Sequence, residues 1–489
     1  MIPKQELLDL ATDFGLQPNV VEKDYTLGWM LAAFGEHAET RDTWLFKGGT
    51  CLKKCFFETY RFSEDLDFTL LEPGHLDVAF LNQIFEDIAT WVYDETGMVL
   101  PPEARKAEVY TNPRGGTSAE GRIGYRGPLG RGGDAPRIKL DLTDHERIVL
   151  DPDRREVHHP FSDRPADGIH VTTYAFEEVF AEKTRALAER LRPRNLYDVV
   201  HLYRRQDLTP ERAKVLSTLT AKCEFKGIAV PTLKSVRESP LVAELQVSWG
   251  QMLAHQLPQL PSFESFWNEL PEVFAWLYEE KPRVHLAAVP SAARDRVDAS
   301  WRPPAMAMSW RSMGVAAPLE IVRFAAANRL CVALDYQNEQ GHRDIRAIEP
   351  YSLRRSSEGN VLLMAVKADT GEVRSYRADR IISAAATDRS FIPRYAIELT
   401  DEGPWSAPPL QREKADSWSP KRAVSTTVRA VRRVAGPRAP AYGPTHHFRC
   451  SVCGKVFKRR DLDSTLNEHK NKSGMPCYGR YGTFVKTTY

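Results

Sequence analysis

The 489-residue sequence has no apolar run close to the roughly 20 residues that a membrane-spanning helix needs. Its first residues, MIPKQELLDLATDFGLQ, place acidic side chains inside the apolar stretch, which excludes the pattern of a secretory signal or a transit peptide. Seven cysteines are too few for a disulfide framework at this length. We therefore expect a soluble, cytoplasmic protein with no membrane contact.

The sequence also lacks a strong charge of either sign, since its net charge is +2. Taken over the whole chain, this balance gives no sign of a polyanionic partner, but from Arg412 to the C-terminus basic residues outnumber acidic ones. The length corresponds to about three domains at a prior of roughly 100 to 200 residues each. The sequence predicts a multidomain globular protein whose C-terminal part is basic.

Hydrophobic periodicity separates the first three segments of the chain. Residues 1–173 alternate helical patterns with short strand patterns, one of them over residues 43–47 ending at the glycine pair 48–49, which is typical of an α+β domain. Residues 174–283 are helical throughout, with helical patterns over residues 176–191, 195–204, 210–223 and 262–277, and are interpreted as a bundle packed on the first segment. Residues 284–317, rich in Pro, Ser, Ala and Arg, interrupt every period and are interpreted as a linker.

The second half of the chain contains three further segments. Residues 318–400 combine one helical pattern, over residues 321–330, with four alternating patterns that predict a small β-rich domain, over residues 331–337, 344–353, 361–367 and 373–382. Residues 401–444 are rich in Pro, Ser and Arg, which is typical of a flexible basic tether. Residues 445–489 form the last compact element, in which three of the seven cysteines lie.

Two carboxylates at strand spacing follow a glycine turn in the first segment. The stretch FKGGT at residues 46–50 precedes RFSEDLD at residues 61–67, and side chains two apart in a strand share a face, so Asp65 and Asp67 point the same way. Asp141 lies on the polar face of another predicted strand. Neighbouring carboxylates repel one another unless a cation with oxygen ligands lies between them. Such a site suits phosphoryl transfer with Mg²⁺ or Mn²⁺, although a lone Asp-x-Asp pair is more often solvated.

These motifs resemble the nucleotidyltransferase toxins of the abortive-infection AbiEii/AbiGii type. The family pattern reads K-G-G-T-x-L-x-K and then R-x-S-x-D-hydrophobic-D. The resemblance covers roughly residues 1–283 and continues through VEKDY at 21–25, KLD at 139–141, AEKTRAL at 181–187 and RNLYD at 194–198. It implies a nucleotidyltransferase-type mixed sheet whose active site is completed by a helical bundle.

The resemblance also implies a role for each motif residue. The residues expected to bind the metal or to complete the catalytic site are Asp65, Asp67, Asp141, Lys183 and Asp198. The residues expected to hold the nucleotide are Gly48, Gly49, Thr50, Lys54, Ser63 and Lys139.

Lys183 stands out by position as well, because it falls on the apolar face of its helical segment, where a lysine needs a charged partner. A nucleotide phosphate, a pair with Asp198 and an ammonium that reaches the domain edge all remain open. One departure from the family pattern is Asn195, which stands where R-D-x-Y-D has a carboxylate that orients Arg194 or the helix.

The function implied by this resemblance is the transfer of a nucleoside monophosphate (NMP) from a nucleoside triphosphate (NTP) to an RNA acceptor. The tRNA 3′ end is the acceptor in some members, and a cognate antitoxin protein restrains the enzyme, as in toxin–antitoxin or phage-defence systems. Two alternatives remain open. One is NMP transfer to a protein hydroxyl, and the other is a nucleic-acid-binding regulator built on a degenerate nucleotidyltransferase scaffold.

Residues 318–400 resemble a WYL domain through ALDY at 333–336, Gly341, Arg346, Glu349-Pro350 and EVRSYRADRI at 372–381. The naming triplet is replaced by VLL at 361–363. The resemblance implies an Sm-like barrel, with Arg346, Arg374 and Arg377 contacting nucleic acid or another ligand. Surface arginines on a small sheet are the alternative.

Close to the C-terminus, Cys450, Cys453, His469 and Cys477 offer the sulfur and imidazole ligands that Zn²⁺ prefers, in a spacing similar to a classical zinc finger. His446 and His447 are alternative ligands. The surrounding basic and aromatic residues suit phosphate backbones and base stacking, although a solvated basic face is the competing interpretation. They are Lys455, Phe457, Lys458, Arg459, Arg460, Lys470, Lys472, Tyr478 and Arg480.

Overall fold

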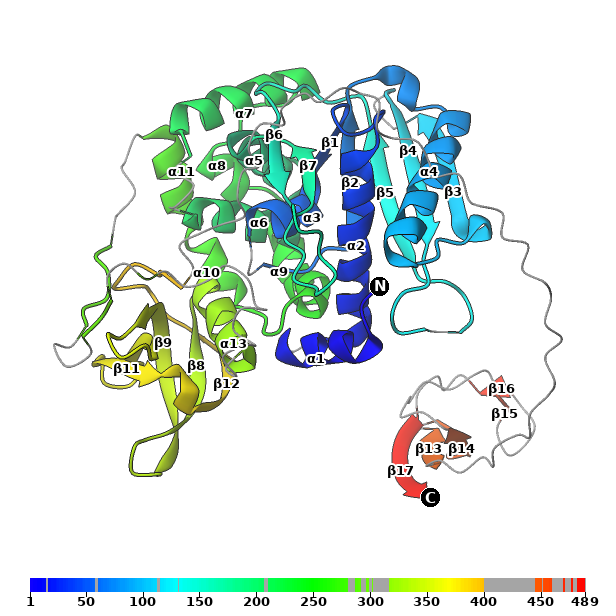
Figure 1. The fold of residues 1–489 in the computed structure, drawn as a ribbon. Coiled ribbons are helices and arrows are strands. Elements are labelled where there is room, and N and C mark those ends of the chain that lie inside the picture. Colours follow the sequence, from blue (N-terminus) through cyan, green and yellow to red (C-terminus); the bar gives the residue numbers. More distant parts are fainter. Residues whose placement is uncertain are drawn as a thin grey trace. The chain divides into compact units, whose positions relative to one another are not determined.

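The fold was analysed in a computed structural model, in which the chain divides into two compact units, Met1–Lys421 and Arg422–Tyr489 (Figure 1). The structure describes residues 1–14, 16–57, 60–111, 115–130, 132–205, 210–279, 286–291, 296–298, 301, 316–399, 445–450, 452–459, 469–470, 476–477 and 482–488. The expected tether, residues 401–444, lies outside the described residues.

A seven-stranded mixed sheet forms the centre of the first unit, in the order β3-β4-β5-β2-β1-β7-β6. The pairs β2/β5 and β1/β7 are parallel, and the other neighbours are antiparallel. This arrangement confirms the predicted mixed α+β fold. The strands are β1 (Trp44–Lys47), β2 (Asp65–Leu70), β3 (Arg105–Thr111), β4 (Thr117–Gly124), β5 (Arg137–Thr143), β6 (Asp153–Glu156) and β7 (His170–Thr173).

Two long helices, α2 (Pro18–Glu36) and α4 (Val78–Thr96), pack against this sheet and against each other (Figure 1). The sequence sets the ends of α4, since the Asp77 side chain accepts a hydrogen bond from the first turn and Gly97 takes the left-handed conformation that ends it. The shorter elements are α1 (Lys4–Phe14), α3 (Gly48–Cys51) and a π-helical turn at Leu52–Phe56 that continues α3. The helix α3 therefore follows β1 directly, at the point where the glycine turn was predicted.

Among the residues that the structure describes, seven helices lie between β7 and the helix α13 (Ala316–Ala327) and form a bundle that corresponds to the predicted helical segment (Figure 1). One predicted helix, over residues 262–277, is two helices in the structure. Pro271 accounts for the difference, because proline is tolerated in the first turn of a helix but not in its interior. The helices are α5 (Phe176–Arg190), α6 (Pro193–Arg204), α7 (Arg212–Lys226), α8 (Leu233–Arg237), α9 (Val242–Leu253), α10 (Phe263–Trp267) and α11 (Leu270–Tyr278).

The last part of the first unit is a five-stranded antiparallel sheet preceded by one helix, which confirms the predicted small β domain. Its strand order is β11-β10-β9-β8-β12. The pattern over residues 373–382 is not one strand, because a 3₁₀ turn at Ala378–Arg380 redirects the chain so that β12 pairs with β8. The elements are α13 (Ala316–Ala327), β8 (Leu330–Gln337), β9 (Arg343–Arg355), β10 (Val361–Lys367), β11 (Val373–Arg377) and β12 (Ile381–Ser390).

Parts of the expected linker pack on this β domain. Val289 is buried in a cluster with Tyr351 and Met364, and the Asp298 carboxylate lies 2.7 Å from the guanidinium of Arg355. The helix α13 in turn shares a continuous hydrophobic core with the helical bundle. The β domain is therefore joined to the catalytic part by packed side chains as well as by the chain itself.

The second unit contains a three-stranded sheet, in the order β14-β13-β17, and a two-stranded ribbon of β15 and β16. Its strands are β13 (Thr445–Cys450), β14 (Val456–Arg459), β15 (His469–Lys470), β16 (Pro476–Cys477) and β17 (Gly482–Thr488). Across the described residues of both units, no helix combines the length and the apolar composition that crossing a membrane requires.

Candidate active site

Three carboxylates meet on two neighbouring strands of the large sheet. Strands β2 and β5 run parallel, with Asp65 beside Lys139 and Asp67 beside Asp141. Because side chains in register across a parallel pair lie on the same face, Asp141 stands next to Asp67, and Asp65 is two residues away on that face. The structure thus brings together the three acids that the sequence singled out.

The ionised forms of two of these acids are disfavoured in the fold. Burial and the neighbouring carboxylate of Asp141 raise the pKa of Asp67 to about 6, against the opposing effect of Lys47 and Lys183. Burial also raises the pKa of Asp65, with Asp141 adding to it. Keeping such carboxylates ionised and close together is unfavourable unless a cation lies between them, and their oxygens are the ligands that a hard divalent cation prefers. The three side chains therefore offer the donor type that Mg²⁺ or Mn²⁺ takes.

The glycine turn lies directly against the carboxylates. Gly48 has a φ of +82°, and a Cβ atom at this position would meet the Asp67 Oδ2 atom at 2.0 Å. A Cβ atom on Gly49 would meet Arg61 at 2.6 Å and the Ser63 Oγ atom at 2.9 Å. Only glycine fits such approaches, so the first turn of α3 brings bare backbone next to the acidic group and to Ser63.

A buried ion-pair network on α5 and α6 adjoins the acids. The Lys183 Nζ atom lies 2.7 Å from Asp198 Oδ2, and Arg61 donates to both oxygens of the same carboxylate, at 2.8 and 3.0 Å. The Tyr60 hydroxyl also donates to Asp198. Burial alone would raise the pKa of Asp198, but Arg61 and Lys183 hold it well below its usual range. Lys183 is thereby fixed between Asp198 and Asp67, whose pKa it lowers.

The other predicted nucleotide-binding residues are distributed unevenly. The Thr50 hydroxyl donates to the backbone oxygen of Asp65 at 2.5 Å, and Lys139 lies 2.8 Å from Asp141. Lys54 is placed elsewhere. Its buried ammonium donates to the Asp24 carboxylate at 2.6 Å and to the backbone oxygen of His158 at 3.3 Å. The structure therefore gathers Gly48, Gly49, Thr50, Ser63 and Lys139 around the acids and gives Lys54 a partner in the core.

Three further side chains belong to this site although the sequence reasoning assigned them no role. Arg61 and Tyr60 hold Asp198, and Arg61 is the first residue of the motif that contains Asp65, which was the available signal. Arg194 lies close enough to Asp65 and Asp198 for their charges to act on it, and its buried Nε atom has no hydrogen-bond partner among the described residues. A guanidinium in this position suits a phosphate oxygen.

The departure at Asn195 has a structural reason. Its side-chain amide donates to the backbone oxygen of Ala186 at 2.9 Å, which ties the start of α6 to the last turns of α5. An ionised carboxylate has no proton to donate to a carbonyl oxygen, so asparagine makes a contact here that aspartate does not. The substitution leaves the Asp198 network in place.

The sequence profile of the family "Nucleotidyl transferase AbiEii toxin, Type IV TA system" matches residues 29–279, just over half of the chain. The chain belongs to the AbiEii nucleotidyltransferase toxin family. It is therefore a nucleotidyltransferase enzyme, and the matched residues include every acid, glycine and lysine of the site described above. A second profile, that of the WYL domain, matches residues 318–386.

Solved structures give weaker similarities. MenT4, a nucleotidyltransferase toxin from Mycobacterium tuberculosis H37Rv, is 14% identical over 58% of this chain and 91% of its own length, with a TM-score of 0.38. Proteasome accessory factor B/C of Arthrobacter aurescens is 14% identical over 37% of this chain and 21% of its own length, with a TM-score of 0.14. No curated protein matches the chain. At these scores neither structure bears on the activity.

The arginines singled out in the WYL domain of this AbiEii-family chain all pair with nearby carboxylates. Arg346 lies 2.9 Å from Asp344, Arg374 pairs with Glu372, and Arg377 pairs with Asp379. Arg346 additionally lies over the rings of Tyr336 and Tyr376, at 5.2 and 5.6 Å from their centroids. A ligand of these arginines has to compete with a carboxylate in each case.

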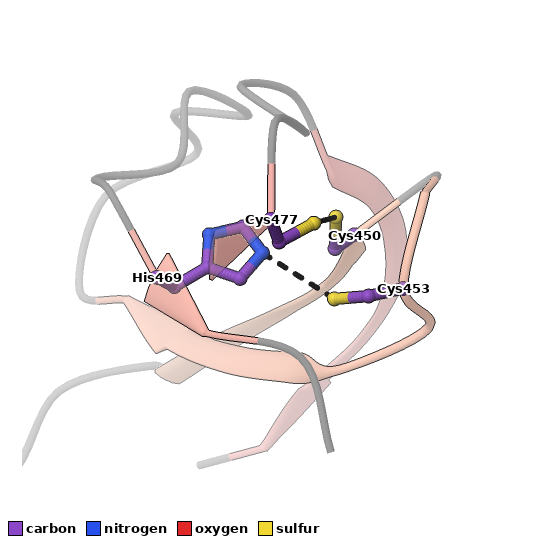
Figure 2. A group of neighbouring side chains, drawn as sticks. All are labelled: Cys450, Cys453, His469 and Cys477. Atoms are coloured by element: carbon purple, nitrogen blue, oxygen red, sulfur yellow. Dashed lines mark hydrogen bonds between the residues drawn. The ribbon is translucent and has the colours of Figure 1, made fainter. Parts of the chain in front are cut away.

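The second unit brings the four predicted zinc ligands together, pointing toward one another (Figure 2). Their ligand atoms all lie within 4.8 Å, with 3.8 Å between the sulfurs of Cys450 and Cys477 and 3.4 Å from Cys453 Sγ to His469 Nε2. Two sulfur ligands of a tetrahedral Zn²⁺ lie about 3.8 Å apart. His447 is not part of the group, and the side chain of His446 lies outside the described residues.

Proposed function

We propose that this toxin is a divalent-metal-dependent enzyme that transfers NMP from an NTP to an RNA acceptor, with the tRNA 3′ end as the first candidate. The observation that carries the proposal is the group of Asp65, Asp67 and Asp141 beside the bare backbone of Gly48. Burial and Asp141 raise the pKa of Asp67, so a nearby cation would stabilise its ionised form, which supports a metal ion at this place.

Each group of residues in the site would have a different role in the reaction. Asp65, Asp67 and Asp141 would hold Mg²⁺, and the ion would supply positive charge against the phosphates during transfer. Gly48, Gly49 and Ser63 lie where the triphosphate would approach the backbone. Lys183 supplies a fixed cation beside Asp67, and its bond to Asp198 keeps the ammonium from swinging away. An acceptor hydroxyl would form a bond to the α-phosphorus and give up its proton to solvent, while the bond from the α-phosphorus to the oxygen that bridges to the β-phosphorus breaks and pyrophosphate leaves.

The proposal includes four specific statements beyond nucleotide transfer itself. They are the RNA acceptor, the Mg²⁺ requirement, a cognate antitoxin and a role in phage defence. RNA is supported by the basic and aromatic residues of the C-terminal segment, because acidic residues outnumber basic ones in the part of the chain before Arg412 and the excess of cations lies after it. There are two alternatives to an RNA acceptor. One is a protein hydroxyl as acceptor, and the other is a regulator without activity. One experiment distinguishes the three possibilities.

The purified full chain should transfer label from at least one of the four α-³²P-labelled NTPs to total RNA in the presence of Mg²⁺. Periodate oxidation destroys the terminal diol, so RNA treated in this way should accept no label if the 3′ end is the acceptor. The double variant Asp65→Ala, Asp67→Ala should lose the transfer, because it removes two of three metal ligands. Asp94→Ala, on the exposed side of α4, is the matched control and should behave as the wild type.

Three results would contradict this assignment. Label in protein and not in RNA would favour a protein hydroxyl, and label in oxidised RNA would exclude the 3′ end. Absence of label in every fraction would favour the regulator. In cells, induction of the wild type should arrest growth and the double variant should not, whereas a regulator would be indifferent to that change.

Zinc binding by the second unit is a separate part of the proposal. The backbone N–H of Cys453 contributes most to lowering the pKa of Cys450, to about 6, and the thiolate is the form that binds metal. Elemental analysis of the purified chain should find about one zinc ion per molecule. Cys477→Ser should lower that content strongly, while Cys223→Ser, which changes a buried thiol in α7, should not. Equal zinc in both variants would refute the site.

A further inference from the structure

Among the contacts between the WYL domain and the catalytic part is a buried polar junction. It joins one face of α6 to the end of α13, and the residues are Tyr197, His201 and Arg204 of α6 with Ala327, Asn328 and Arg329. The spacing of the α6 residues, four and then three, puts all three side chains on the same side of that helix. The end of α13 and the residue that follows it therefore contact a single face of α6.

Asn328 is the centre of the junction and is fully buried. Its Oδ1 atom accepts from the Tyr197 hydroxyl at 2.9 Å and lies 3.3 Å from His201 Nε2, while its Nδ2 atom donates to the backbone oxygen of Phe324 at 3.0 Å. The bond to Phe324 fixes which way the amide points. Burial and the charge of Arg204 lower the pKa of His201 well below its usual value, so the imidazole is neutral and its Nε2 proton faces Asn328.

Next to Asn328, the carboxylate of Glu269 pairs with two arginines and also joins the two parts. Glu269 lies 2.8 Å from Arg329 of the WYL domain and also pairs with Arg204 of α6. Arg204 further donates to the backbone oxygen of Ala327 at 3.1 Å. Arg329 has a left-handed backbone, with a φ of 55°, which is unusual for a residue other than glycine. The fold maintains that conformation at the place where α13 turns into β8.

The same α6 residues touch the catalytic network on their other side. The ring of Tyr60 packs against those of Tyr197 and His201, with 5.5 Å between centroids in both cases. The hydroxyl of Tyr60 donates to Asp198, which is the neighbour of Tyr197 in α6 and the partner of Lys183. A shift of α6 at the junction would therefore move the carboxylate that holds the catalytic lysine.

We infer that Asn328 is a positioning residue, through which the WYL domain holds α6 and so keeps Asp198, Tyr60 and Lys183 in place for transfer. The inference rests on the proposed function for its catalytic consequence. Its structural part, the coupling between the end of α13 and the segment around Tyr60, stands on the contacts alone. A ligand that loosens or tightens the WYL domain would act on the reaction by this route.

The test compares Asn328→Ala with Asn338→Ala in the full chain. Asn338 lies in the exposed turn between β8 and β9 and makes only local hydrogen bonds there, so it is a matched control in the same domain. Hydrogen–deuterium exchange should become about tenfold faster in α6 and around residues 60–64 in Asn328→Ala, because this change removes both hydrogen bonds from the Asn328 side chain to α6. Tyr197→Phe, which keeps the ring packing and removes one hydroxyl, should show a smaller change in the same segments.

The transfer assay gives the second readout. The kcat of Asn328→Ala should fall about tenfold with KM for the NTP within about twofold, because the residues that Asn328 holds act on the reacting centre and not on nucleotide capture. Exchange that stays at the wild-type level around Tyr60, or a kcat that does not fall, overturns the inference. If the wild type transfers no nucleotide, the proposed function fails, and the exchange measurement, which needs no substrate, still decides the coupling.

Discussion

Asp67→Asn is expected to lower the rate of nucleotide transfer by about 10³-fold or more and, at the same time, to raise the stability of the metal-free protein. The loss of rate follows from removing a ligand of a cation that supplies several kcal/mol of charge stabilisation. The gain in stability follows from the raised pKa of Asp67, about 6, which shows that its ionised form is disfavoured in the fold. Relieving that strain is worth up to about 3 kcal/mol.

The pH dependence has a definite sign. An acid whose pKa is higher in the folded protein than in the unfolded chain makes the free energy of unfolding fall as the pH rises between the two values. For the metal-free wild type this fall should occur between about pH 4 and pH 6, so the advantage of Asp67→Asn should grow over that window and stay constant above it. Urea unfolding in EDTA at several pH values measures the difference.

Mg²⁺ provides the control for this prediction. It should raise the unfolding temperature of the wild type above pH 6 and leave that of Asp67→Asn almost unchanged, because binding of the ion to the folded state requires the ionised carboxylate. Asp94→Asn, an exposed position on α4, should respond to Mg²⁺ as the wild type does. A metal-free Asp67→Asn variant that is less stable than the wild type at pH 7 would show that the site is not built for a cation.

Asp198→Ala is expected to destabilise the whole catalytic part by about 3 to 5 kcal/mol, the cost of leaving a buried charge without its partner. The side chain of Asp198 is 0% exposed and that of Arg61 is 2% exposed, so water does not replace the lost carboxylate. The free energy of unfolding, measured with urea, should fall accordingly, and transfer should be lost with it.

Lys183→Met is the matched comparison, because it removes one partner of Asp198 and leaves the two hydrogen bonds from Arg61. Its free energy of unfolding should fall by only about 1 to 2 kcal/mol, while transfer should still fall by about 10²-fold through loss of the fixed cation. Similar losses of stability in the two variants would mean that Asp198 serves mainly to hold the lysine. A fully active Lys183→Met would remove Lys183 from the reaction.

Much of the local architecture was predictable because it depends on periodicity and on single residues. The two-residue spacing of Asp65 and Asp67 placed both on one face, and the structure agrees. The strand ending in the glycine turn, the helix α5 and the strand β10 lie where the patterns put them. The errors lie at breaks, such as Pro271 and the turn at Ala378–Arg380, where one residue or a short turn overrides a periodic pattern.

Other features depended on which segments meet, and no local pattern encodes that. Lys54 shared a motif with the nucleotide-binding glycines, yet a helix that precedes it in the chain supplies Asp24 and draws the lysine into the core. The sequence showed Asn195 only as a missing carboxylate, whereas the structure shows that its amide donates a hydrogen bond to the backbone oxygen of Ala186. The contact of Asn328 with Tyr197 of α6 joins residues that lie 131 positions apart, and no sequence pattern around either residue predicts it.

The sequence by itself determined the chemistry of this protein: an acidic pair on one face of a strand, a glycine turn beside it, a lysine on an apolar helix face and a Cys-x-x-Cys pair near the end. Each of these is a property of residues close together in the chain, which strand and helix geometry converts into a direction. The tertiary structure alone decided which distant residues these side chains contact. Asp141 lies beside Asp67, Arg61 and Lys183 pair with Asp198, and the WYL domain contacts α6. Contacts between distant segments follow from how whole faces pack, and the spacing of residues along the chain does not record that packing.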